Sequence, residues 1–197
     1  MKKTMQLLAA GIALAASVGA NAAVLDFEGG GLGGGFSWNN FYTLNSTGSV
    51  YDQSGYENGT VSGSYVAYNA NGTSASLASF SSFVFNGAYF AGAWNNGLSI
   101  TVNGFLGGVQ TLSETFLVST NAPLWRSFGW TVDSLTFSTA GGTPAPGLNG
   151  AGTHFAMDNF TYNEVLSPVP EPETYAMLAV GLGLLGAFAR RRKQNAA

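Results

Sequence analysis

Four oxygen-bearing side chains near the two ends of the central region have the chemistry of a calcium site. They are Asp26, Glu28, Asp158 and Asn159. Calcium takes several oxygen ligands from carboxylates, amides and backbone carbonyls. If the first and last strands are neighbours, these four side chains can converge, and Asp26 and Glu28 share a face in a regular strand. The alternative is that they hydrogen-bond backbone groups at strand ends, and both interpretations stay open.

Aromatic rings are the second candidate chemistry, because a flat ring can stack against a sugar. Trp94 stands before Asn95-Asn96-Gly97, and Trp125 lies between Pro123 and Arg126, so both are expected near loops. We predict these two tryptophans as ligand-binding residues. Trp130 alternates with apolar neighbours and is expected in the core, where most large aromatic side chains must pack.

Catalytic groups are scarce in the central region. It has no cysteine, no lysine and a single histidine, His154, so a nucleophile with its base or a histidine-rich zinc site is hard to assemble. Paired carboxylates for glycoside hydrolysis would have to come from Glu57, Glu114 and Asp133, and no spacing singles out a pair. The expectation is a protein that is not an enzyme.

The charge of this region restricts its partners. Residues 23–167 hold eight acidic residues and one basic residue, Arg126, which gives a net charge of about −7. Nucleic-acid binding needs clustered lysine and arginine and is excluded. Without disulfides, stability has to come from the core, helped at most by a structural calcium ion.

The hydrophobic pattern predicts strands. Apolar residues alternate at 98–102 and 128–132, and no stretch of the region has a helical stripe. Asn-Gly pairs such as Asn103-Gly104 suit turns that need a positive φ. We expect an all-β domain at 23–167, an antiparallel jelly-roll-like sandwich. Its strands are expected at 24–27, 36–44, 65–69, 80–90, 98–105, 110–118, 127–132, 135–138 and 154–162, and the Gly- and Pro-rich loop 139–153 could border a binding face.

Residues 1–22 have the three parts of a secretory signal peptide. Lys2 and Lys3 precede an apolar core, and the segment ends in Ala20-Asn21-Ala22. Export through the Sec translocon and cleavage by signal peptidase are therefore expected, which would place the central region outside the cytoplasm.

The C-terminal 168–197 has a second address signal. Val169-Pro170-Glu171-Pro172 precedes an uncharged apolar run, which we predict as a transmembrane helix at 174–189. A basic stop follows directly and indicates a cytoplasmic C-terminus; its residues are Arg190, Arg191, Arg192 and Lys193. The two prolines keep the backbone around Glu171 extended, a form that a processing enzyme can grip.

The order and spacing of these three parts resemble the PEP-CTERM sorting signal. The resemblance implies that an exosortase, an integral-membrane enzyme, cuts at the motif during export, so that Pro170, Glu171 and Pro172 are a substrate site. It further implies a transient inner-membrane intermediate, followed by the outer surface or the extracellular matrix.

Several motifs of the central region resemble the β-sandwich ectodomain of PEP-CTERM proteins, which is similar to jelly-roll carbohydrate-binding modules. These are residues 25–29, 102–105, 133–135 and 155–160. In similar sugar-binding sandwiches a structural calcium lies between the domain ends. We therefore expect an exported, exosortase-processed protein of the cell surface or biofilm matrix that is adhesive or binds exopolysaccharide. The alternatives are a structural surface protein with no specific ligand and an extracellular glycoside-active enzyme.

Overall fold

The computed structural model describes residues 23–163. The chain divides into two compact units, Met1–Glu164 and Val165–Ala197, and all the described residues belong to the first. No helix within 23–163 is long and apolar enough to cross a membrane. The predicted signal peptide, sorting motif, transmembrane helix and basic stop lie outside the described residues.

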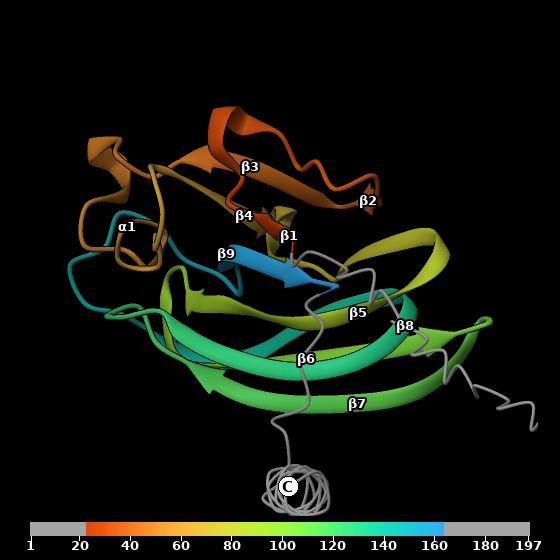
Figure 1. Cartoon of the computed structure of the whole chain (residues 1–197). Helices are drawn as coiled ribbons and strands as arrows, with labels where there is room; N and C mark the ends of the chain where they lie inside the picture. Colours follow the sequence, from red (N-terminus) through yellow and green to blue (C-terminus); the bar gives the residue numbers. More distant parts are fainter. Residues whose placement is uncertain (1–22, 164–197) are drawn as a thin grey trace, which may run out of the picture. The chain divides into compact units, whose positions relative to one another are not determined.

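The expected all-β, antiparallel architecture is confirmed (Figure 1). Between residues 23 and 163 the strands are β1 (Ala23–Leu25), β2 (Ser37–Asn39), β3 (Phe41–Asn45), β4 (Tyr65–Asn69), β5 (Ala75–Gly92), β6 (Asn95–Leu106), β7 (Val109–Val118), β8 (Leu124–Pro144) and β9 (Phe155–Tyr162). The short helical turns are η1 (Glu28–Gly30), η2 (Ser49–Tyr51), α1 (Gly55–Asn58) and η3 (Ala70–Gly72). The jelly-roll order of the strands stays a prediction.

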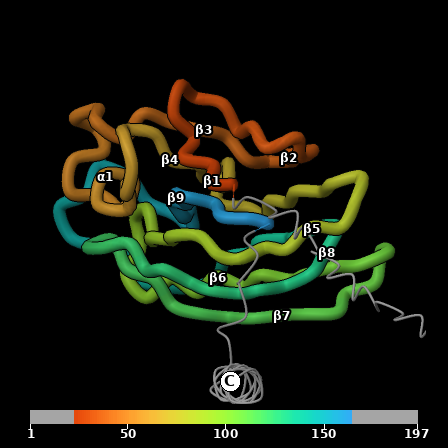
Figure 2. The backbone as a smooth tube through the Cα atoms, viewed as in Figure 1, coloured from red at the N-terminus to blue at the C-terminus, as the bar shows by residue number. Residues whose placement is uncertain are grey.

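Two long strands, β5 and β8, join the strands into two layers. The strand order is β3-β4-β9-β5-β8-β6-β7, with β1 on β9 and β2 on β5. The second half of β5 pairs with β9 and with the first half of β8, whereas the first half of β5 pairs with the second half of β8, which continues to β6. Both strands therefore fold over, at residues 79–82 of β5 and near Asp133 of β8, as Figure 2 lets the reader follow.

Alternating side chains fill the space between the layers. Leu98, Ile100 and Val102 of β6 are fully buried, as the alternation at 98–102 predicts. Around them stand rings from both layers, such as Phe85, which stacks on Phe160 with centroids 4.8 Å apart. A second, smaller cluster forms on the outer side of the β3-β4-β9-β5 layer, where α1 and its flanking turns cover the strands.

Several predicted strand boundaries were wrong. The first strand ends at Leu25, and Phe27 has a left-handed φ of 59°, so Asp26 and Glu28 do not share a face of a regular strand. Asn40, with φ 56°, divides the expected strand 36–44 into β2 and β3. The expected strands 127–132 and 135–138 are parts of the single strand β8, which also takes in the start of the loop expected at 139–153.

Not every Asn-Gly pair makes a turn. Asn103 and Gly104 lie inside β6, where a Cβ on Gly104 would come within 2.8 Å of Val132 Cγ1. The glycine is there because the facing strand approaches closely, and not because the backbone reverses.

The strand register defines two ends of the domain. Tyr162 pairs with both Ala23 and Phe85, and Asn163 hydrogen-bonds Val84, so the described chain begins and finishes beside the β5 bend. The turn between β6 and β7 lies at the same end. Ser134 of β8 pairs with Ala78, just before the β5 bend, and with Phe105, just before that turn, so the three residues form one row across the sheet. We call this the terminal end. The distal end holds the β5–β6 turn, the loop 119–123 and the loop 145–153.

Candidate ligand-binding site

Trp125 lies on the outer face of β8 near the distal end. Its side chain is 39% exposed, and its ring packs beside that of its strand partner Tyr89, with centroids 5.0 Å apart and planes tilted by 57°. Gly87 leaves room for it, since a Cβ there would come within 2.6 Å of Trp125 Cζ2. A partly open aromatic ring is thus available to a ligand here, and its assignment as a ligand-binding residue stays a prediction.

Trp94 has a different setting. It is only 8% exposed and packs in the second hydrophobic cluster. Its ring makes an edge contact with Tyr56 of α1 at 5.3 Å, and a Cβ on Gly150 would come within 2.4 Å of it. Since both faces are occupied by protein, its position favours a structural role over stacking on a sugar.

The four candidate calcium ligands each have hydrogen bonds to protein groups. The Asp26 carboxylate accepts from the Glu28 backbone N–H, and the Glu28 carboxylate accepts from Ser64 and Tyr65, both at 2.8 Å. Although β1 does pair with β9, no group of three or more acidic, histidine or cysteine side chains within 23–163 could hold a metal ion. The hydrogen bonds are those expected of backbone-binding residues, and calcium stays a prediction.

Asp158 is the most buried of these carboxylates. It is fully buried and accepts the backbone N–H groups of Val61 at 2.7 Å, Ser62 at 2.9 Å and Asn159 at 2.7 Å. Burial raises its pKa, and the three N–H donors partly oppose that rise. The carboxylate fastens the loop after α1 to β9. Asn159 adds a bond from the Ser62 hydroxyl to its Oδ1 at 2.7 Å.

The carboxylates considered for catalysis lie on different elements, each with its own partner. Glu57 of α1 accepts from the Gln53 backbone N–H, Glu114 of β7 pairs with Arg126, and Asp133 of β8 accepts from the Gly107 backbone N–H. The Nδ1 atom of His154 is buried without a partner among the described residues, and burial lowers the pKa of this imidazole.

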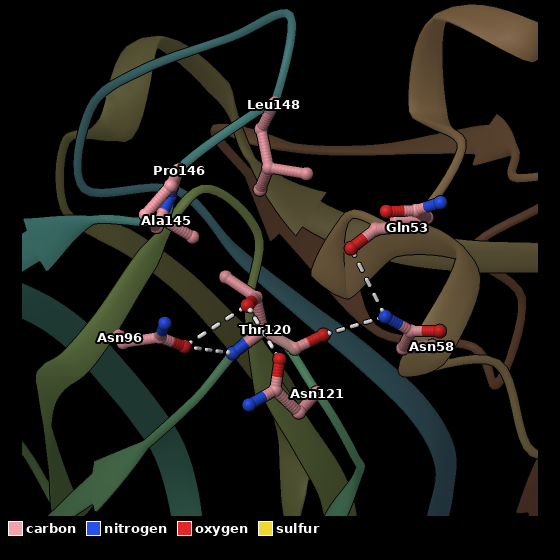
Figure 3. Close-up of a pocket in the computed structure, with 8 residues that line it drawn as sticks. All are labelled: Gln53, Asn58, Asn96, Thr120, Asn121, Ala145, Pro146 and Leu148. Carbon is pink, nitrogen blue, oxygen red and sulfur yellow. Dashed lines mark hydrogen bonds between the residues drawn. The ribbon is translucent and has the colours of Figure 1, made fainter.

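A pocket at the distal end brings together side chains that are far apart in sequence (Figure 3). It has a volume of about 330 Å³, which is at the lower end of the range for small-ligand sites. One wall belongs to the α1 segment, a second to the start of β6 and the loop after β7, and the third to the loop after β8. The lining residues are Gln53, Asn58, Asn96, Thr120, Asn121, Ala145, Pro146 and Leu148.

Hydrogen bonds fix two of the polar walls to each other. Asn58 Nδ2 donates to the Thr120 carbonyl at 2.9 Å and to the Gln53 carbonyl at 3.0 Å. Asn96 Oδ1 accepts both the N–H and the hydroxyl of Thr120, each at 2.9 Å. The Asn58 and Asn96 side chains are therefore held in place, as Figure 3 shows.

Other amide groups of the pocket are free to bind a ligand. Within residues 23–163, the Nδ2 atoms of Asn96 and Asn121, Asn58 Oδ1 and the whole side-chain amide of Gln53 have no hydrogen-bond partner. Opposite them, Pro146 and Leu148 offer apolar surface. Among residues 23–163, no acidic or basic side chain lines the pocket. The site can hydrogen-bond hydroxyl groups through donors and acceptors, but this part of its lining has no general acid or base.

The second hydrophobic cluster supports the pocket walls. Gly55 of α1 lies so close to β5 that a Cβ would come within 1.9 Å of the Gly92 carbonyl oxygen, and the Gly55 N–H donates to Ala93. The Ser54 hydroxyl caps α1 by accepting from the Tyr56 N–H at 3.2 Å. On the other side, Leu148 packs with Trp94 in the same cluster. The buried tryptophan thus stands behind two of the walls.

The sequence analysis missed most of this pocket. Its one pointer was the loop 139–153, expected to border a binding face, and three lining residues do come from that loop. The pair Asn95-Asn96 and the adjacent polar residues Thr120 and Asn121 were a further signal, because Asn and Thr side chains supply hydrogen-bonding groups. Their convergence depends on strand pairing that no local pattern reveals.

Comparisons with known proteins give a sorting motif and distant structural similarities. No curated protein matches the chain. Among solved structures, a DUF4465 family protein from Bacteroides caccae shares 16% identity, covering 73% of this chain and 80% of its own, with a TM-score of 0.44. TmCBM61, solved in complex with β-1,4-galactotriose, shares 14% identity over 70% of this chain and 92% of its own, with a TM-score of 0.42.

The C-terminal residues of the chain match a known family model. Residues 168–193 match the model of the PEP-CTERM protein-sorting motif, which confirms the resemblance seen in the sequence. This motif is the recognition signal of exosortase and implies export with processing at the membrane. The chain is therefore an exosortase-targeted protein that carries a PEP-CTERM sorting motif at residues 168–193.

Proposed function

We propose that the described domain is a non-catalytic module that binds a neutral polysaccharide, and that the tail delivers it through an inner-membrane intermediate to the outer surface or the exopolysaccharide matrix. The observation that carries the proposal is the distal pocket, where unpartnered amide atoms face apolar surface and where no lining residue that the structure describes is charged. Sugars present hydroxyl groups at their edges and C–H groups on their faces. Such a lining therefore complements a neutral sugar.

The charge of the domain agrees with a neutral ligand. Arg126 is the only basic side chain among the described residues, and it already pairs with Glu114. An acidic polysaccharide would find no unpaired cation within 23–163. Trp125, four residues after Asn121 in the chain, offers a partly open ring near the same end of the domain. Stacking of a neighbouring sugar on this ring would extend the contact along a polymer.

Calorimetry with neutral and acidic oligosaccharides tests the proposal on the full chain in detergent. Asn121→Ala removes the unpartnered Nδ2 donor and should weaken binding of a neutral oligosaccharide roughly three- to tenfold, the effect of one neutral hydrogen bond. Gln110→Ala is the matched control, because it removes an exposed amide from β7 at the terminal end and should leave the affinity unchanged. No binding of any neutral glycan would leave a structural surface protein without a specific ligand.

The sorting function has a separate test. Glu171→Ala should leave export intact and block removal of the tail, so that an unprocessed, membrane-held form accumulates. Mass spectrometry of the C-terminus of parent and variant measures this. Identical mature masses would mean that the motif is not recognised.

A further inference from the structure

The bend of β5 presents a large apolar side chain to solvent. Phe80 is 107% exposed, whereas Phe83 and Phe85 of the same strand are 5% and 0% exposed. Serines surround it on both sides at 79, 81 and 82. The core gains nothing from a phenylalanine at this position, since the side chain stands clear of the fold.

Two more apolar side chains lie at the same end. Leu106 and Val109 flank the Gly107-Gly108 turn between β6 and β7 and are 43% and 65% exposed. β5 and β6 both pair antiparallel with β8, so they run in the same direction past the row formed by Ala78, Ser134 and Phe105. Phe80 and Leu106 therefore both project beyond that row at the terminal end, on strands that lie about 10 Å apart with β8 between them.

The chain also leaves the domain at this end. Asn163 hydrogen-bonds Val84, just beyond the bend that carries Phe80. Only the eleven residues 164–174 separate Asn163 from the apolar run that begins at Tyr175. A fully extended chain spans at most roughly 3.5 Å per residue, so these eleven residues reach about 40 Å. While the tail is held in a bilayer, the terminal end of the domain stays within that distance of the lipid surface.

We propose that in this membrane-held form the terminal end docks on the lipid surface by shallow insertion of Phe80, with Leu106 and Val109 beside it. The contact is apolar and not electrostatic, because the one basic side chain among residues 23–163, Arg126, belongs to β8 near Trp125 and pairs with Glu114. Tethering by a short linker gives an effective concentration in the millimolar range, so a weak intrinsic affinity suffices. Docking would also leave the distal pocket pointing away from the membrane.

This inference rests on the tail being held in a bilayer and is independent of the ligand of the pocket. The chain has no cysteine, so a single introduced cysteine can be labelled cleanly. Ser81→Cys places an environment-sensitive fluorophore beside Phe80, and Ala122→Cys places one in the distal loop. The twelve residues of β6 separate the two ends by roughly 40 Å. The full chain is reconstituted into phosphatidylcholine vesicles, and integration of the tail is verified by flotation and resistance to alkaline carbonate.

A lipid that carries a spin label near its headgroup quenches the fluorophore when the two are close, and so reports contact with the bilayer. We expect quenching at position 81 and none at position 122, in both low and high salt. Adding Phe80→Ser to the Ser81→Cys chain should lower the ratio of docked to undocked molecules roughly tenfold, since it removes the large apolar side chain that would enter the bilayer. Phe80 is exposed, so this variant should keep the circular dichroism spectrum of the parent.

Three results would overturn the proposal in a chain whose tail is integrated: equal quenching at 81 and 122, quenching at 81 that is undiminished in Phe80→Ser, or quenching abolished by high salt. Protection of the label that rises with the protein-to-lipid ratio, without lipid quenching, would show that a second copy of the chain covers Phe80 instead.

Discussion

Replacing Trp94 and Trp125 by alanine, one at a time, should separate a structural tryptophan from an accessible one. Trp94 is 8% exposed and contacts Tyr56 and Tyr51 in the second cluster, with ring centroids 5.3 Å and 6.4 Å away. Loss of a tryptophan from such a site destabilises a protein by roughly 3–5 kcal/mol. For a domain of this size the melting temperature should fall by about 10 °C.

Trp125→Ala makes the same chemical change with a smaller structural effect. The ring is 39% exposed and contacts Tyr89, a pair worth about 1 kcal/mol beyond its buried area. We expect the free energy of unfolding to fall by roughly 1–2 kcal/mol and the melting temperature by only a few degrees. The affinity of the Trp125→Ala variant for a neutral oligosaccharide should also fall, because an accessible stacking surface is lost.

Urea denaturation of the full chain in detergent, followed by circular dichroism, measures the two free energies of unfolding. Trp94→Phe is the control, since it retains an aromatic ring against Tyr56 and should cost less than Trp94→Ala. Equal losses for the two alanine variants, or a larger loss for Trp125→Ala, would refute the assignment of Trp94 to the supporting cluster.

Three further variants test individual contacts. Asp158→Asn turns an amide donor toward buried N–H groups and should lower the free energy of unfolding by roughly 2 kcal/mol; an unchanged thermal midpoint would contradict the role of this carboxylate. Gly55→Ala would force a methyl group against the Gly92 carbonyl, so we expect a loss of about 1–3 kcal/mol together with weaker glycan binding, and full retention of both would contradict the packing of α1. Burial lowers the pKa of His154, so the contribution of the neutral imidazole to stability is present above pH 6.5 and is lost as the pH falls. The difference in free energy of unfolding between the parent and His154→Gln should therefore shrink between pH 7.5 and pH 5. A difference that stays constant over this range would contradict the lowered pKa.

The sequence predicted the class of fold because alternation is a local property. Leu98, Ile100 and Val102 alternate with polar residues, and this period places them on one face of any strand they form. The sorting motif could also be recognised from the sequence, since it is contiguous at 168–193 and needs no tertiary context.

Boundaries and roles were harder, because they depend on neighbours that are distant in sequence. Strand β8 continues through the point where two strands were expected, since it pairs along most of its length with β5 and then with β6. In the same way, Trp94 and Trp125 both stand next to loops in the sequence. Only the packing of α1 and residue 150 against Trp94 makes one of them buried and the other accessible.

The sequence by itself therefore determined that residues 23–163 form an acidic all-β domain and that residues 168–193 carry a sorting motif, because composition, period and contiguous motifs are local. The tertiary structure decided the rest. It folded β5 and β8 over, placed Phe80 beside the exit of the chain, and gathered the pocket residues from segments near 53–58, 96, 120–121 and 145–148. Those positions meet through long-range strand pairing, which depends on the burial of the whole core and is recorded in no single stretch of residues.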